Sequence, residues 1–288
     1  MPYCIYSGAT TNENLMNPEH IIPLSLGGCD SFTIKVSKAK NSEVNQKVDG
    51  KLNNDFLMKA RQVQHGFKGH SGAAPVLKVK NAKVDGNPVT WEYSQKEIKA
   101  FDHKCKAYLQ GKQCVELAAQ FNLEIRRKFI AKIALATGYF LFEDIFVNNA
   151  DHNSLRTFVF ADDVKNLKLD LRFYDEFQSP GTLNIPKNPR WETNKLIAAR
   201  IESSGVLWGY DPDRIVVHVF IGSILLGMVS FKAKIPAFYL DNEVCDDFGT
   251  VIRIENNRTI TCLPYRSELQ EVLKYIDALK SQKGEPPC

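Results

Sequence analysis

The sequence PEHIIPLSLGG occupies residues 18–28, and the fold expected for the start of the chain follows from it. Residues 3–6 and 20–24 are short apolar runs typical of strands, and Gly27-Gly28 forces a turn after the second run. Residues 37–59 contain no proline, and apolar side chains recur there at the period of an amphipathic helix, which Gly50 weakens in its middle. The sequence therefore predicts short strands, a tight turn and a helix, in that order.

Glu19 and His20 are the first residues of this stretch that can carry chemistry. Neighbouring side chains of a strand point to opposite faces, so one of the two could bind a divalent cation while the other faces a substrate water. The alternative is a surface carboxylate beside a packed histidine, and the two residues alone do not decide between these interpretations.

A longer pattern surrounds this pair: C-x-x-S-G from Cys4, E-H-I-I-P-x-x-L-G-G from Glu19, and a helix carrying Asn41 and ending in V-D at Asp49. It resembles the HNH (His-Me finger) endonuclease family over about residues 4–56, roughly a fifth of the chain. The resemblance implies an α+β protein that opens with a ββα-metal nuclease domain. In that family a β-hairpin and a helix clamp one divalent cation.

The resemblance also implies roles for individual residues. His20 resembles the general base that activates a water, and Glu19 and Asn41 resemble the metal ligands. Hard oxygen donors of this kind suit one Mg²⁺ or Mn²⁺ ion better than a zinc-type site. The family's middle asparagine has no clear counterpart, but Ser31 or Thr33 lies near its position, and either hydroxyl could bond the backbone across the hairpin.

Two departures from the family pattern concern structural roles. The four zinc-binding cysteines of the family align with Cys4, Ser7, Ser37 and Lys40, so we expect no structural zinc and expect packing to hold the hairpin instead. The family's helix glycine is replaced by Asn45, one turn beyond Asn41. Asn45 either supports the metal site or contributes only to packing, and the sequence favours packing.

Charge is distributed unevenly along the 288 residues. The net charge is +4, and residues 1–100 hold 13 basic and 9 acidic residues while residues 101–288 hold 24 of each. A basic stretch beside a nuclease motif can follow a phosphate backbone, whereas by charge alone a solvated helix face is the simpler interpretation. The residues that we expect to contact nucleic acid are Lys38, Lys40, Lys47, Lys51 and Arg61.

The rest of the chain gives coarser expectations. We predict a β-hairpin over residues 77–93, helices over 95–110 and 115–137, and two strands within 216–231. The basic residues at 126–132 predict a helix with one buried and one basic face, and His218 reads as a core histidine. The expected domains are residues 1–95, the HNH-like nuclease domain with its following loop and hairpin, and residues 96–288, a larger mixed α+β domain for substrate selection or dimerisation.

Several classes of protein are excluded by composition. No apolar stretch reaches the roughly 20 residues of a membrane span, and MPYCIYSG at the start lacks the features of a secretory signal. The seven cysteines form no C-x-x-C motif and no evident disulfide framework, so we expect reduced thiols and a cytoplasmic protein. No phosphate-binding loop, dinucleotide fingerprint or serine-hydrolase elbow is present.

The expected function is metal-dependent hydrolysis of DNA phosphodiester bonds, and a homodimer would suit duplex cleavage. Restriction, phage defence and the homing of mobile elements all fit such a chain. Three alternatives stay open: a nucleic-acid-binding module whose nuclease core has decayed, an RNA-directed nuclease or toxin, and an interaction scaffold in which residues 101–288 carry the function.

Overall fold

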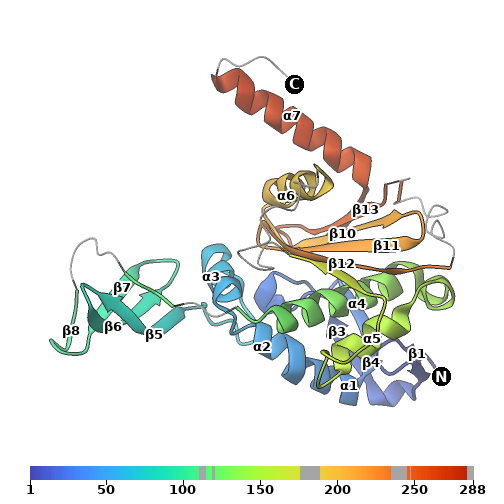
Figure 1. Ribbon diagram of the computed structural model, residues 1–288, viewed down its shortest axis with the longest axis horizontal. Helices are drawn as coiled ribbons and strands as arrows, with labels where there is room; N and C mark the ends of the chain where they lie inside the picture. The colour runs from blue at the N-terminus through green and yellow to red at the C-terminus, as the bar shows by residue number, and fades with distance from the viewer. Residues whose placement is uncertain (110–114, 119–120, 176–188, 235–244, 247, 284–288) are drawn as a thin grey trace.

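The computed structural model describes residues 1–109, 115–118, 121–175, 189–234, 245–246 and 248–283 (Figure 1). It combines helices with antiparallel sheets, so the predicted mixed α+β class is confirmed. The layers stack in one direction: the N-terminal elements lie on one side of a long helix, and a large sheet lies on the other (Figure 1). A small sheet projects from this body.

The N-terminal layer is built from short strands and a segmented helix. Its β elements and single turns of 3₁₀-helix are β1 (Tyr3–Cys4), β2 (Ala9–Thr10), η1 (Glu13–Leu15), β3 (Met16–His20), η2 (Leu24–Leu26) and β4 (Thr33–Ser37). Strands β3 and β4 are antiparallel. The turn between them needs both glycines: Gly27 has a φ of +84°, and a Cβ on Gly28 would lie 1.7 Å from the Ile22 carbonyl oxygen.

The helix predicted over residues 37–59 is present but divided. Its parts are α1 (Lys38–Val44), the π-helix η3 (Asn45–Asp49), α2 (Gly50–Leu52) and, after a break, α3 (Phe56–His65). The Ser37 side chain caps α1 by accepting from the Lys40 amide. Asp55 caps α3 by accepting from the amides of Leu57 and Met58, which explains why a new helix begins there.

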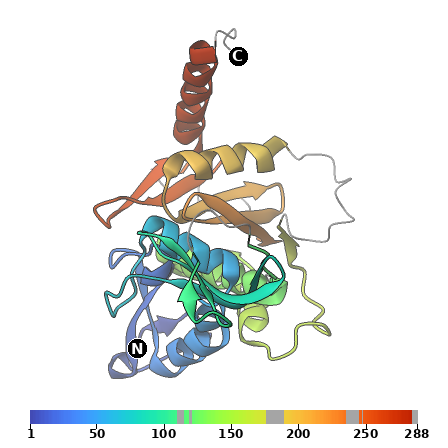
Figure 2. The same ribbon diagram turned by 90° about the vertical axis from the view of Figure 1, so that its left-hand side faces the viewer.

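The projecting sheet corrects one prediction. The hairpin over 77–93 is confirmed, with Asp85 and Gly86 at the turn, but the helix predicted over 95–110 is wrong. The sheet consists of β5 (Leu77–Val84), β6 (Asn87–Tyr93), β7 (Ile98–Asp102) and β8 (Ala107–Tyr108), in that order (Figures 1 and 2). Strand β6 offers a free edge, and pairing along it outweighs the helix propensity of the lysine-rich segment. The boundary predicted at residues 95/96 falls inside this sheet.

Helix α4 (Leu123–Asn149) is the central element of the body. It starts at the Asn122 cap, eight residues later than predicted, and is interrupted by a non-helical residue at Glu143. It contacts β4 and α2 on one side and β11 and β12 on the other. The predicted basic face is wrong, because the basic side chains of its first turns are buried: Arg126 and Lys132 are 0% exposed and Lys128 is 5% exposed.

The large sheet has six antiparallel strands in the order β14-β13-β10-β11-β12-β9. The C-terminal elements are α5 (His152–Phe160), β9 (Arg172–Tyr174), α6 (Pro189–Ile201), β10 (Gly205–Asp211), β11 (Arg214–Ile221), β12 (Ile224–Lys232), β13 (Thr250–Ile254), β14 (Ile260–Pro264) and α7 (Tyr265–Lys283). The two predicted strands within 216–231 are therefore confirmed. Helix α6 covers the face of the sheet opposite to α4, and α7 runs away from the body (Figures 1 and 2).

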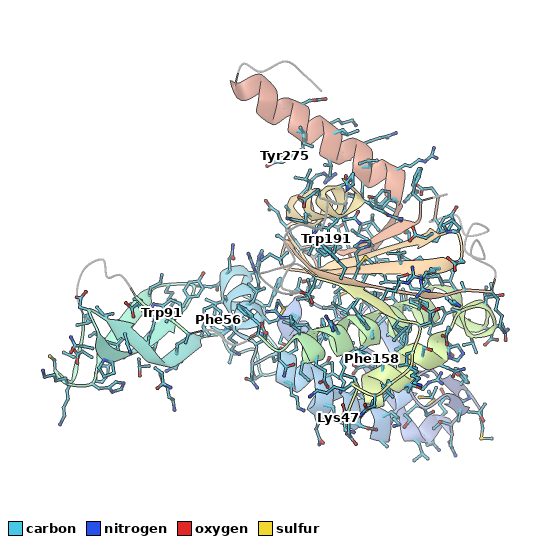
Figure 3. All side chains as sticks on the ribbon, viewed as in Figure 1. Lys47, Phe56, Trp91, Phe158, Trp191 and Tyr275 are labelled. Atoms are coloured by element: carbon cyan, nitrogen blue, oxygen red, sulfur yellow. The ribbon has the colours of Figure 1, made fainter. Side chains whose placement is uncertain are left out.

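The core of the body is shared between the N-terminal and C-terminal parts. One buried cluster contains Val44 of α1, Phe129 of α4 and Trp208 of β10. Trp191 belongs to a second cluster between α6 and the sheet, and Trp91 packs on a third within the projecting sheet (Figure 3). The three tryptophans therefore serve separate cores.

Candidate active site

A pocket of about 440 Å³ opens where β3, the turn after it and the segmented helix meet. Glu19, His20 and Asn41, the three residues to which the sequence assigns chemistry, all line it. Asn45 and His70 line it as well. The pocket thus gathers residues from the hairpin, from the helix that follows it, and from the glycine-rich loop after α3.

The strand register places Glu19 and His20 differently within the pocket. Glu19 pairs with Ile34 and His20 with Thr33 across the β3–β4 ladder, so their side chains leave opposite faces of the hairpin. Glu19 is buried and 5% exposed, whereas His20 stands at the mouth of the pocket with its side chain 17% exposed. The carboxylate is therefore deep in the site, and the imidazole is accessible to a substrate.

The His20 ring is held by a residue that the sequence did not single out. Its Nε2 lies 2.9 Å from Oδ1 of Asp30, in the turn before β4. This hydrogen bond lowers the pKa of the Asp30 carboxyl, even though the carboxyl is exposed. With Nε2–H donating to Asp30, Nδ1 is the nitrogen left to accept a proton, and among the described residues it has no hydrogen-bond partner.

The two hydroxyls expected near this position play lesser parts. Thr33 Oγ1 donates to the carbonyl of Asp30 at 3.3 Å, so it braces the turn that carries the carboxylate. Ser31 Oγ lies 3.3 Å from Sγ of Cys29 and does not touch His20. The sequence signal for Asp30 is only its place in the loop between the histidine and the second strand, and this signal is too weak to identify it.

One face of the segmented helix lines the pocket with polar side chains at every fourth position: Asn41, Asn45, Asp49 and Asn53. In an α-helix each four-residue step turns the face by about 40°. The wider π-helical turn of η3 counteracts this drift, which keeps the side chains on one face. The spacing is visible in the sequence, but without the π-turn it does not predict a single face.

Hydrogen bonds fix the first of these amides. Asn41 Nδ2 donates to Asn17 Oδ1 at 3.1 Å and to the Pro18 carbonyl at 3.3 Å, which ties α1 to β3. Asn45 Nδ2 donates to Asn41 Oδ1 at 2.6 Å. Asn45 is therefore in direct contact with the expected ligand, and its amide orients that of Asn41.

A buried lysine from α4 enters the same site. Lys132 Nζ lies 2.7 Å from Glu19 Oε1 and 3.1 Å from Asp49 Oδ2. The same ammonium donates to the carbonyls of His20 at 2.9 Å and Ile21 at 3.0 Å. The ion pair with Glu19 Oε1 is the shortest of these contacts. The lysine lies more than a hundred residues from Glu19, and the sequence pattern gave no signal for it.

Burial and charge act against each other in this cluster. Burial raises the pKa of the Asp49 carboxyl to about 6, and the Lys132 ammonium opposes the rise. Burial acts to lower the pKa of Lys132, but the carboxylates of Asp49 and Glu19 outweigh it, so the pKa is raised. The lysine is therefore charged at neutral pH.

The donor set fits a hard divalent cation. Glu19 and Asp49 supply carboxylates, Asn41 and Asn45 supply amides, and Asp49 Oδ1 is buried without a hydrogen-bond partner in the described part of the chain. Glu19 and Asp49 carry two negative charges, and Lys132 compensates one of them, so one negative charge is left for a cation. Among the described residues no group of three or more histidines, cysteines and acidic residues is placed to hold a metal, so amides or waters must complete the coordination.

The positions that align with the family's zinc ligands lie together at the start of α1. Cys4 Sγ accepts from the Ser37 amide at 3.2 Å, and Ser7 Oγ lies 3.4 Å from the Cys4 carbonyl. Lys40 points elsewhere, toward Glu43 and over the ring of Phe160. Arg156 of α5 holds this turn, because it donates to the Ile5 carbonyl at 2.7 Å and to Tyr3 Oη at 3.0 Å.

The basic residues expected to contact nucleic acid differ in the contacts that they make within the protein. Lys47 pairs with Glu43 and with Asp162 at 2.7 Å, and Lys40 shares the same Glu43. Lys38 donates to the Asn14 carbonyl and Arg61 donates to Gln64, whereas Lys51 is exposed. Since these ion pairs are partly solvated, a phosphate can compete for the lysines at low energetic cost.

The two loop histidines differ in placement. The ring of His70 lies 5.5 Å from that of His20, edge to face, and His70 lines the pocket. His65 instead stacks on Phe67 at 5.1 Å, outside this pocket. His218 is a buried strand residue that bonds Asn194 at 3.1 Å, so its prediction as a core histidine is confirmed.

Comparisons with protein-family models, curated proteins and solved structures find no match to this chain. Across the described residues, none of the helices combines the length and the apolar character needed to cross a membrane.

Proposed function

We propose that the chain is a metal-dependent endonuclease of the HNH (His-Me finger) type that hydrolyses phosphodiester bonds of DNA. The observation that carries the proposal is the arrangement around one pocket: β3 ends in His20, β4 returns antiparallel, and the helix that follows presents Asn41 beside the buried Glu19. The resemblance of the sequence and the chemistry of the site support the same function.

In this proposal His20 is the general base. Nδ1 accepts a proton from water, the water oxygen forms a bond to phosphorus, and the bond between phosphorus and the leaving oxygen breaks. Asp30 holds the ring through Nε2 and stabilises the imidazolium that forms. The leaving oxygen takes up a proton from solvent, so the reaction is hydrolysis without a covalent enzyme intermediate.

Glu19 and Asn41 would hold one Mg²⁺ or Mn²⁺ ion, with Asn45 orienting the Asn41 amide. Bound there, the ion supplies charge stabilisation for the phosphate and the leaving oxygen. Lys38, Lys40, Lys47, Lys51 and Arg61 would contact the phosphate backbone. Duplex cleavage with one such pocket per chain calls for two chains, so the proposal includes a homodimer.

A second function has an observation in its favour. Glu19, the carboxylate proposed as a metal ligand, already contacts the Lys132 ammonium at 2.7 Å. A nucleic-acid-binding module that has lost its cation would have this arrangement, because the lysine replaces the missing positive charge. Such a module would bind DNA and leave it intact with every divalent cation.

Plasmid cleavage distinguishes the two functions. The full chain is incubated with supercoiled DNA and, in parallel, with single-stranded RNA of equal nucleotide concentration, in Mg²⁺, Mn²⁺ or EDTA. The endonuclease converts supercoiled plasmid to nicked or linear forms with either cation, and EDTA stops it. Gel-shift binding without cleavage in all conditions supports the binding module instead, and cleavage of RNA alone supports the RNA-directed alternative.

A further inference from the structure

Lys132 is the buried titratable group of the site that the proposed reaction does not use. Its ammonium is 0% exposed and has four oxygens within 3.1 Å, from Glu19, Asp49 and the carbonyls of His20 and Ile21. This is the environment of a bound monovalent cation. The side chain reaches it from α4, the helix that also contacts the large sheet.

We propose that Lys132 is a positioning residue that supplies a fixed positive charge to the site and thereby limits it to one divalent cation. The inference rests on the proposed function only in assuming that the pocket binds a divalent cation at all. It concerns the number of cations and their affinity, and it does not depend on which nucleic acid is cut.

The charge balance supports this role. Glu19 and Asp49 are both buried, and two carboxylates that share one ammonium would repel each other strongly without it. With Lys132 present the cluster carries a net charge of −1, which suits a single cation completed by amides and waters. Without Lys132 the cluster would carry a second negative charge and attract cations more strongly.

The backbone contacts support a positioning role as well. Lys132 Nζ bonds the carbonyl of His20 itself and of the next residue, Ile21. The lysine therefore fixes the main chain that carries the general base, at the point where β3 ends. One side chain of α4 thus orients the base and sets the charge of the cation site together.

A lysine that merely fills the core would behave differently. Removing it would destabilise the protein and would weaken or leave unchanged the binding of a divalent cation. The inference predicts instead that removing Lys132 strengthens the binding of a divalent cation. The sign of this change, measured in folded protein, separates the two roles.

The test measures Mn²⁺ binding to the full chain by titration calorimetry at pH 7.5, with folding checked by circular dichroism. Wild type is expected to bind one Mn²⁺. Lys132→Met is expected to bind Mn²⁺ at least about tenfold more tightly or to take up a second ion, because a repelling charge is gone. Lys128→Met is the matched control: Lys128 lies one turn earlier on α4, is also buried, and bonds the Ala161 carbonyl away from the pocket.

A second comparison keeps the inference testable if Lys132→Met fails to fold. Asp49→Asn removes one carboxylate, so Asp49→Asn/Lys132→Met restores the wild-type charge balance without a buried ion pair. The double variant is expected to bind Mn²⁺ at least about tenfold more tightly than Asp49→Asn alone. Equal or weaker binding after loss of the lysine, in either background, overturns the inference.

The outcome is separable from that of the nuclease proposal. Tighter Mn²⁺ binding in the lysine variants supports the role of Lys132 even if wild type leaves DNA intact. Absence of Mn²⁺ binding in wild type and in every variant overturns both. Cleavage of DNA by wild type together with weaker Mn²⁺ binding in Lys132→Met overturns this inference alone.

Discussion

The His20 imidazole is oriented by one exposed carboxylate, and this contact is the most informative detail at the scale of single residues. Asp30 lies in a turn and its side chain is 93% exposed, yet it determines which ring nitrogen is left to accept a proton. An exposed carboxylate is screened by solvent, so its effect on the base is smaller than that of a buried partner.

Asp30→Asn is therefore expected to lower the cleavage rate without abolishing it. We expect a loss of about 10- to 100-fold, because the ring loses its orienting charge while the base itself is retained. Glu13→Gln is the matched control, since Glu13 is an exposed carboxylate that pairs with Lys35 at 2.8 Å outside the pocket. Rates of plasmid nicking under single-turnover conditions measure both. Equal rates for Asp30→Asn and wild type would remove Asp30 from the site.

Some of this site could be predicted from the sequence. Glu19, His20 and Asn41 lie within one short motif, and local hairpin and helix geometry is enough to bring them together. Lys132 could not be predicted, because it reaches the pocket only through the packing of a distant helix. Its neighbours in the sequence form an amphipathic pattern that suggests a solvated basic face. In the structure, ion pairs with buried carboxylates offset the free-energy cost of burying Arg126 and Lys132.

At the scale of elements, the apolar period predicted a helix after β4 but neither its π-turn nor its break. The break depends on side-chain contacts: the Asp55 carboxylate caps α3 and also pairs with Arg126 of α4 at 2.9 Å. The strand β7 was missed for a related reason, since pairing with β6 outweighs local propensity. The strands of the large sheet were predictable because β11 is buried on both faces and five of its eight residues are β-branched.

Strand β11 also gives a prediction about pH. Burial lowers the pKa of His218 to about 3, so the folded protein keeps this imidazole neutral while the unfolded chain protonates it near its ordinary value. The folded pKa is depressed, so below about pH 6.5 the unfolded state binds a proton that the native state does not, and stability is lost as pH falls. Between pH 7 and pH 5 this residue is expected to cost about 2 kcal/mol.

Urea unfolding at the two pH values measures this effect. In His218→Gln, whose side chain can still accept from Asn194, the decrease in unfolding free energy between pH 7 and pH 5 should be about 2 kcal/mol smaller than in wild type. His103→Gln, at an exposed site in the turn before β8, is the control and should follow wild type. An identical pH dependence for His218→Gln and wild type would contradict the burial of a neutral histidine.

At the scale of the whole molecule, the β3–β4 hairpin and the large sheet depend on each other through α4. The main buried cluster contains residues from the first strand to β13, and α4 supplies the cations for Glu19, Asp49 and Asp55. The small core of β5–β8 is separate from it. The composition and length suggested domains but could not reveal a core built from segments so far apart in the chain.

A fragment of residues 1–95 is therefore expected not to fold cooperatively. It would expose the apolar surface that α4 covers and leave three buried carboxylates without their cations, a loss of several kcal/mol for each broken pair. Amide dispersion in a ¹⁵N–¹H correlation spectrum of the fragment, compared with the full chain, measures this. A well-dispersed spectrum and a cooperative thermal transition in the fragment would show that the hairpin and helix are stable alone.

Substitution of His20 tests directly whether this residue activates water in a cation-dependent nuclease. Full-length His20→Ala and wild type are compared in nicking of supercoiled plasmid with Mn²⁺, with His103→Ala as control and with DNA binding measured in parallel. We expect His20→Ala to lose at least about 100-fold in rate while DNA binding and folding stay at wild-type levels. Unchanged cleavage by His20→Ala would contradict it.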